Sequence, residues 1–267
     1  MLSNIDLVTR PAFVVSAVTC RSDHRHWTEP EARDDYRIVL VRSGRFRRSV
    51  GGVGVDLEPT IAYVGVPGEE ERFAHPAGGD VCTSVQVAPE LWRDLAGEAG
   101  GTARSALYVD GPLDLAHRRC LRAAARGDVD YAATEHLLAL VHRAVEQVVA
   151  RPRPIDRPAT DRRLVAAARE AIAVDHPAAA GLVPLAALVG ASPYRLSRAF
   201  TRELGVSVTR YRNRVRLGRA LDRLEAGEPS LAVLAADLGF ADQAHLSRTV
   251  REQLGHTPTV LRRLLVP

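Results

Sequence analysis

Short apolar segments separated by turn residues fill residues 12–87 of the chain. β-Branched and aromatic residues gather in five of these segments, which we predict as strands at 36–41, 45–50, 53–57, 60–64 and 81–87. Glycines at positions 44, 51 and 52 stand between neighbouring segments, where a chain must turn. Short strands at such close spacing predict an antiparallel barrel or sandwich.

After Pro89 the pattern becomes helical, and it is strongest in residues 130–150. Apolar and small side chains recur there at spacings of three and four, as on one face of a helix. The stripe consists of Tyr131, Thr134, Leu138, Val141, Val145 and Val148. It has two interpretations, packing on the β-rich part of the chain or forming part of a dimer interface, and the sequence leaves both open.

The clearest boundary in the chain is the segment 151–159, which contains three prolines. Proline cannot continue a helix and favours an extended linker. We therefore expect an α+β protein with three parts: a β-rich domain at 1–150, a linker at 151–159 and an all-helical domain at 160–267. The β-rich domain contains short strands followed by helices.

The helical domain contains an internal repeat with an offset of 50 residues. Residues 196–205 align with residues 246–255, and Leu, Ser, Arg, Leu and Gly are identical at matching places. The same offset pairs Ala186 with Ala236, Leu188 with Leu238 and Ala191 with Ala241. Two copies are too few for a solenoid, so the repeat indicates a duplicated small motif.

Each copy has the pattern of a helix-turn-helix motif. In the first, a short apolar helix at 185–189 precedes Gly190, and Ser192 with Pro193 begins a second helix. In the second, the two helices are predicted at 231–238 and 242–254, with Gly239 at the turn.

A helix at 207–225 is predicted to join the two motifs and would span about 28 Å at 1.5 Å per residue. Successive major-groove faces of B-DNA lie roughly 34 Å apart, so such a spacer suits two motifs on one face of a duplex. Six arginines decorate it: Arg210, Arg212, Arg214, Arg216, Arg219 and Arg223.

Charge separates the two parts of the chain. Residues 160–267 hold 16 arginines against 10 acidic residues, whereas residues 1–159 hold 20 against 22. The net charge of +4 therefore comes from the helical part, as in a protein that binds nucleic acid. No run of 18 apolar residues occurs, so we expect a cytoplasmic protein without a membrane partner.

Over residues 160–267 the chain resembles the AraC/XylS family of bacterial transcription regulators. The resemblance rests on Leu196-Ser197-Arg198 with Phe200, on Glu203-Leu204-Gly205, on Leu238–Gln243, and on Gly255–Pro258. It implies a sequence-specific DNA-binding regulator, an activator or a repressor, that acts without a cofactor. The residues expected to face double-stranded DNA are Tyr194, Arg195, Ser197, Arg198 and Arg202 in the first motif, and Gln243, Ala244, His245, Ser247 and Arg248 in the second.

The same resemblance implies a cupin-like β-barrel in the N-terminal domain, a small-molecule effector, a homodimer and contact with RNA polymerase. A metal-dependent cupin enzyme with an accessory helical domain is the alternative, because His24, His26, Glu31 and His75 are residue types that bind transition metals. Their order along the chain does not fit the cupin metal motif, so a polar surface loop is the preferred interpretation.

Catalytic signatures are otherwise missing from the sequence. It contains no nucleophile elbow, phosphate-binding loop or dinucleotide fingerprint, so we expect a protein that is not an enzyme. Cys20, Cys82 and Cys120 are widely spaced, which argues against a disulfide framework or a structural zinc site and leaves a redox-sensing thiol open.

Overall fold

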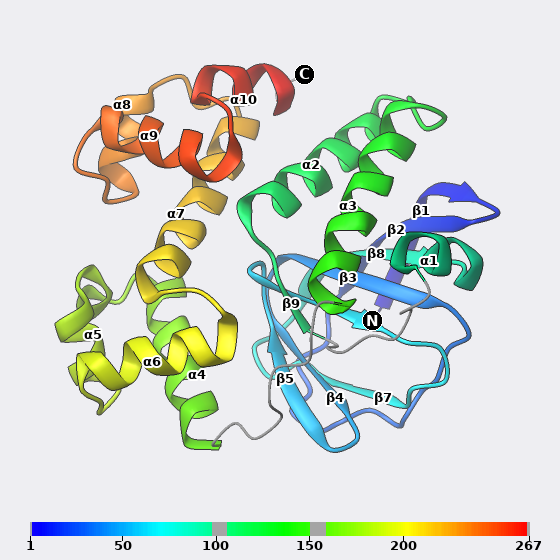
Figure 1. The fold of residues 1–267 in the computed structure, drawn as a ribbon, viewed down its shortest axis with the longest axis horizontal. Helices are drawn as coiled ribbons and strands as arrows, with labels where there is room; N and C mark the ends of the chain where they lie inside the picture. The colour runs from blue at the N-terminus through cyan, green and yellow to red at the C-terminus, as the bar shows by residue number, and fades with distance from the viewer. Residues whose placement is uncertain (1, 98–105, 150–158, 266–267) are drawn as a thin grey trace. The chain divides into compact units, whose positions relative to one another are not determined.

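A computed structural model describes residues 2–97, 106–149 and 159–265 of the protein (Figure 1). The chain divides into two compact units, Met1–Pro152 and Arg153–Pro267. The predicted linker 151–159 lies outside the described residues except for Ala159, where a helix begins.

The described strands of the N-terminal unit pair into two antiparallel sheets. The larger sheet has the order β1-β2-β8-β3-β6-β9, formed by β1 (Leu2–Arg10), β2 (Phe13–Cys20), β8 (Asp80–Val87), β3 (Tyr36–Ser43), β6 (Ile61–Gly65) and β9 (Ala106–Tyr108). The smaller has the order β5-β4-β7, formed by β5 (Val53–Leu57), β4 (Phe46–Val50) and β7 (Glu71–Ala74). The five predicted strands are β3, β4, β5, β6 and β8, and their antiparallel pairing confirms the predicted class.

The described residues of the unit also form the helices α1 (Pro89–Ala96), α2 (Gly111–Ala125) and α3 (Ala132–Val149). The buried face of α3 shares one hydrophobic cluster with α2 and with strands of the larger sheet, so Val141 and Val145 pack inside the chain. The dimer-interface interpretation is therefore wrong for these two residues. Two members of the predicted stripe do not belong to this face, since Tyr131 precedes the helix and is 82% exposed and Leu138 is 37% exposed.

The C-terminal unit is all-helical, as predicted. It contains α4 (Ala159–Ala173), a short 3₁₀ turn η1 (Pro177–Ala180), α5 (Leu182–Leu188), α6 (Pro193–Leu204), α7 (Val208–Glu225), α8 (Leu231–Asp237), α9 (Gln243–Leu254) and α10 (Pro258–Leu265). Figure 1 shows the pairs α5–α6 and α8–α9 at opposite ends of α7. None of the helices in the described part of the chain is long and apolar enough to span a membrane.

The spacer helix α7 supports both ends of this unit. Tyr211 is fully buried and its ring meets Phe200 of α6 edge-on, with 5.5 Å between the ring centroids. Leu217 and Leu224 continue the buried face. Arg214, predicted as a surface arginine, lies on that face instead and is only 3% exposed. A buried arginine needs partners for its guanidinium, and Arg214 has such interactions.

Candidate nucleic-acid interface

Helix α6 presents a polar face because its apolar residues are fixed on the other side. Ser192 begins the helix, and its hydroxyl accepts a hydrogen bond from the backbone N–H of Arg195 at 3.2 Å. An N-cap of this kind stabilises a helix by about 1 kcal/mol. Leu196 and Phe200 are completely buried, which turns the intervening positions outward. The predicted DNA-facing residues Tyr194, Arg195, Arg198 and Arg202 are exposed, and Ser197 is half-buried.

Helix α9 is built in the same way in the second motif. Asp242 is its N-cap, and the carboxylate accepts from the backbone N–H of His245 at 2.6 Å. Leu246 and Val250 are both 1% exposed and anchor the helix. The predicted residues Gln243, Ala244 and Arg248 are exposed, whereas His245 and Ser247 are half-buried.

Two of the predicted DNA-facing side chains already have partners within the unit. The Nδ1 atom of His245 accepts from the backbone N–H of Ala241 at 3.3 Å, and its ring meets Phe240 edge-on. Arg202 forms an ion pair with Asp161 of α4 at 3.0 Å, and that aspartate is buried. These contacts position helices and turns, so both residues are weaker candidates for DNA contact than their neighbours.

The two motifs differ by one residue in the turn. The first helices bury an equivalent Leu-Ala pair, at 185–186 in α5 and at 234–235 in α8, which is an offset of 49. The turn glycines, Gly190 and Gly239, keep this offset, whereas α6 and α9 are offset by 50. The backbone N–H groups of Ala191 and Phe240 donate to Ala186 and Ala235 in the same way, so these two residues correspond and the extra residue in the second turn is Ala241. The following predicted pairs are therefore wrong: Ala186 with Ala236, Leu188 with Leu238, and Ala191 with Ala241.

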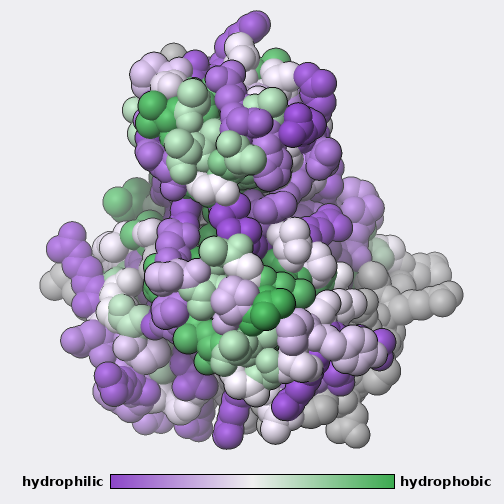
Figure 2. Space-filling view, turned by 90° about the vertical axis from the view of Figure 1, so that its left-hand side faces the viewer, coloured by the Kyte–Doolittle hydropathy of each residue, from purple (hydrophilic) through white to green (hydrophobic). Residues whose placement is uncertain are grey.

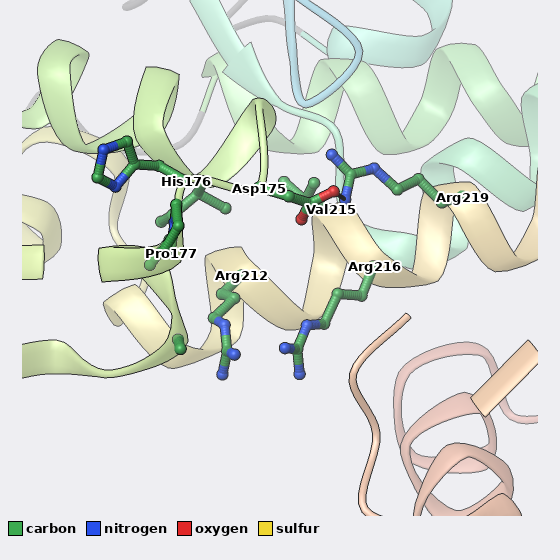
Figure 3. Close-up of a pocket in the computed structure, with 10 residues that line it drawn as sticks. Asp175, His176, Pro177, Arg212, Val215, Arg216 and Arg219 are labelled. Carbon is green, nitrogen blue, oxygen red and sulfur yellow. Dashed lines mark hydrogen bonds and ion pairs between the residues drawn. The ribbon is translucent and has the colours of Figure 1, made fainter. Parts of the chain in front are cut away.

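A pair of arginines on α7 was not among the predicted site residues. Arg212 and Arg216 lie one helical turn apart and line a pocket of about 140 Å³ with residues of η1 and the end of α4. Figure 3 shows their guanidinium groups side by side, pointing the same way. Partial burial lowers the pKa of both groups, and the charge of Arg212 lowers the pKa of Arg216 further.

The acidic residue that lines the same pocket, Asp175, already pairs with another arginine. Asp175 accepts a hydrogen bond from Arg219, whose other terminal nitrogen donates to the Ala173 carbonyl at 2.6 Å. Two half-buried cations that face the same way favour an anion beside them. The sequence signal was the arginine spacing of four on α7, which brings both side chains to one face.

Of the four residues named as metal ligands in the alternative enzyme interpretation, the three histidines lie together and Glu31 does not. The rings of His24, His26 and His75 come together, with centroid distances of 4.7 Å for the first pair and 5.2 Å between His24 and His75. Glu31 does not join them, because its carboxylate accepts a hydrogen bond from Arg33 at 2.8 Å. A cysteine and an aspartate, which were not in the predicted set, lie beside His75 instead.

Comparisons with known proteins give sequence matches to part of the chain. Residues 185–264 match the model of a family described as "Helix-turn-helix domain". The arabinose operon regulatory proteins of Salmonella typhimurium and Escherichia coli are each 34% identical to this chain over 71 residues, or 27% of it. The aligned part spans only about a quarter of those relatives' length, 25% and 24%.

Solved structures resemble the chain more distantly. ToxT from Vibrio cholerae is 12% identical, with 96% of this chain and 99% of that chain covered at a TM-score of 0.38. A cupin superfamily protein from Desulfitobacterium hafniense is 12% identical over 33% of this chain and 78% of its own, at a TM-score of 0.30. Residues 185–264, which hold two capped motifs on one spacer helix, thus match a helix-turn-helix family, and part of the chain is similar to the arabinose operon regulatory proteins.

Proposed function

We propose that the protein is a transcription regulator that binds double-stranded DNA through α6 and α9. The observation that carries the proposal is the equivalence of Arg198 and Arg248. Both are exposed, both lie six residues after the N-cap, and both face away from the buried side of their helix. A second helix presented in this way is the element that enters a major groove in helix-turn-helix proteins.

The spacing of the two motifs supports the same proposal. Helix α7 is 18 residues long and therefore spans about 27 Å at 1.5 Å per residue. Its buried face packs against α6 and α10, which makes the spacer part of the folded unit. Two motifs held at this distance suit neighbouring major-groove segments, which lie roughly 34 Å apart along straight B-DNA.

The residues proposed to contact DNA have graded roles. Arg198 and Arg248 are assigned to base edges or phosphates, because a guanidinium can donate to two acceptors of guanine at once. Tyr194, Arg195, Ser197, Gln243 and Ser247 are assigned to the surrounding contacts, and Ala244 offers only its methyl group. Arg202 and His245 are assigned to holding the motifs in shape, for the partners described above.

Arg212 and Arg216 are proposed to bind a DNA phosphate between the two motifs. Each phosphate that a protein neutralises makes binding more sensitive to salt. A phosphate would also relieve the repulsion between the two half-buried guanidinium groups. This contact would fix the position of the protein on the duplex and would carry no sequence information of its own.

The remaining parts of the function are carried by the family resemblance. The proposal therefore also includes a small-molecule effector bound by the N-terminal unit, a homodimer, contact with RNA polymerase and action in the cytoplasm. It further includes that the protein acts by binding and not by catalysis. Sedimentation of the purified chain measures the dimer, and the surface of α3 around Tyr131 and Leu138 is the exposed part of the predicted stripe available for it.

The deciding experiment is binding of the full chain to a randomised double-stranded DNA library at several salt concentrations. We expect enrichment of sites with two conserved segments about 10 base pairs apart. We also expect affinity to fall steeply with salt, by a logarithmic slope of about 0.9 for each phosphate contacted. A folded protein that enriches no sequence and shows no salt-dependent binding contradicts the proposal.

A further inference from the structure

A cluster of metal-binding side chains lies at one end of the larger sheet of the N-terminal unit. Cys20 ends β2 and Asp80 begins β8, and the two residues are directly opposite in the antiparallel register. His75 follows β7, and its backbone N–H donates to the carbonyl of His24 at 2.9 Å, which brings the segment after β2 to the same place. Two segments that are distant in sequence, 20–24 and 75–80, therefore meet here.

The separation of the two central atoms is the first argument for a metal. Cys20 Sγ and His75 Nε2 are 3.6 Å apart. Zinc binds thiolate sulfur at about 2.3 Å and imidazole nitrogen at about 2.0–2.1 Å, and a tetrahedral angle between such bonds places sulfur and nitrogen about 3.6 Å apart. The side chains are thus already at the separation that one shared ion requires.

A second observation that favours a metal is the way in which the His75 imidazole is held. His75 Nδ1 lies 2.7 Å from Asp80 Oδ2, and Asp80 Oδ1 accepts from the Cys82 thiol at 3.1 Å. An oxygen acceptor at Nδ1 selects the tautomer with a free lone pair on Nε2, as is usual for histidines that bind metals.

The burial and the atom types of the donors indicate which kind of metal ion the site would bind. Cys20 is 6% exposed, and the side chains of His75 and Asp80 are 12% and 4% exposed, so two of the donors are shielded from water while His24 is half-buried. Sulfur and imidazole donors suit zinc and other late divalent transition metals, whereas magnesium and calcium prefer oxygen.

We propose that the N-terminal unit binds one Zn²⁺ through Cys20 Sγ and His75 Nε2, with His24 Nε2 as third ligand after a rotation of its side chain. Asp80 orients His75 and does not bind the ion. The fourth position remains open to water or to a small ligand. The wide spacing of the cysteines disfavours a site made of cysteines alone, whereas this mixed site is assembled by the pairing of β2 with β8.

The test is titration of the chelator-stripped, thiol-reduced full chain with Zn²⁺ alone, in competition with a chromogenic chelator. We expect about one ion per chain. Cys20→Ser and His75→Gln should each weaken binding by about 100-fold or more, because even loss of an orienting partner costs 10–100-fold. Cys120→Ser is the matched control, since Cys120 is also buried but its thiol donates to the Ala133 carbonyl, and it should leave affinity unchanged.

Replacement of zinc by Co²⁺ provides a second readout. The wild-type protein should show a sulfur-to-cobalt charge-transfer absorption that Cys120→Ser retains and Cys20→Ser loses. If Cys20→Ser does not fold, His24→Gln replaces it, because His24 lies on a half-buried loop, and it should weaken binding about 10-fold or more. Failure of the wild-type chain to bind Zn²⁺, or Zn²⁺ binding that Cys20→Ser or His24→Gln leaves unchanged, overturns the proposal and leaves a thiol–imidazole hydrogen bond as the role of the contact.

Discussion

Removal of the two equivalent arginines is the sharpest test of the proposed DNA interface. Arg198→Ala and Arg248→Ala delete side chains that are exposed and lie off the buried faces of α6 and α9. The guanidinium of Arg198 lies 5.8 Å from the centre of the Tyr194 ring, which is itself exposed. Neither substitution removes a buried contact, so we expect stability to change by no more than about 0.5 kcal/mol.

The size of the effect on DNA binding depends on what each arginine contacts. Loss of a bidentate contact with guanine costs about 1–3 kcal/mol, or roughly 5- to 150-fold in affinity, and relaxes specificity at one base pair. Loss of a phosphate contact weakens all sequences alike and lowers the salt slope by about 0.9. Both motifs are fully capped and both have buried anchors, so we expect the two variants to lose comparable affinity, at base positions about 10 base pairs apart.

The assay is binding to the randomised library at two salt concentrations, with circular dichroism to verify folding. Arg163→Ala is the charge-matched control, because Arg163 is exposed on α4 outside both motifs. If Arg198→Ala and Arg248→Ala remain folded and keep wild-type affinity, specificity and salt slope, the assignment of this face to DNA is wrong.

Three further predictions concern other parts of the chain. Replacing Arg212 and Arg216 by alanine should lower the salt slope by about 0.9 without changing the enriched sequence, and an altered sequence preference would contradict a phosphate contact. Val141→Asp should lower the free energy of unfolding of the N-terminal unit by about 4 kcal/mol or more in urea, because Val141 is fully buried, whereas Leu138→Asp on the exposed side of α3 should cost less than about 1 kcal/mol. Burial lowers the pKa of His117 to about 4, below its usual value near 6.5. The contribution of the buried neutral imidazole to the free energy of unfolding is therefore fully present above pH 6.5 and is lost as the pH falls toward 4. The loss should be about 3 kcal/mol, and a pH series of urea unfolding on His117→Gln should lack it.

The sequence predicted those parts of the fold in which local pattern and tertiary environment agree. Strands β3 to β6 and β8 were predictable because β-branched residues alternate with glycine turns. Strand β1 was not predicted because it is largely exposed and its sequence, LSNIDLVTR, has no apolar face. Strand β9 was not predicted because it has only three residues. Strand β7 buries Glu71, whose carboxylate pairs with the buried Arg48, so its polar sequence conceals an interior position.

In the candidate sites, too, the sequence predicted what local pattern determines and not what depends on tertiary packing. Exposure of Arg198 and Arg248 was predictable, because the apolar spacing of α6 and α9 fixes which side chains point outward. The ion pair of Arg202 with Asp161 was not, since it depends on how α4 packs against α6. Cys20 and Asp80 lie together because of the register between β2 and β8. The sequence does not give the register of two strands whose paired residues are 60 positions apart.

The turn glycines of the two motifs lead to a prediction that links the second turn to the proposed phosphate site. Gly190 and Gly239 occupy equivalent places, with φ of +67° and +69°, a region that costs an ordinary residue roughly 1 kcal/mol. A Cβ at Gly190 would meet no atom within 4 Å, whereas a Cβ at Gly239 would lie 2.7 Å from a terminal nitrogen of Arg216, whose guanidinium also packs over Phe240. We therefore expect Gly190→Ala to cost about 1 kcal/mol of unfolding free energy and to leave the salt dependence of DNA binding unchanged. Gly239→Ala should cost at least as much and should also alter the salt slope, because it displaces Arg216 from beside Arg212. Urea unfolding and binding at two salt concentrations measure both quantities on the matched pair, and equal salt slopes for the two variants would show that Arg216 does not contribute to the interface.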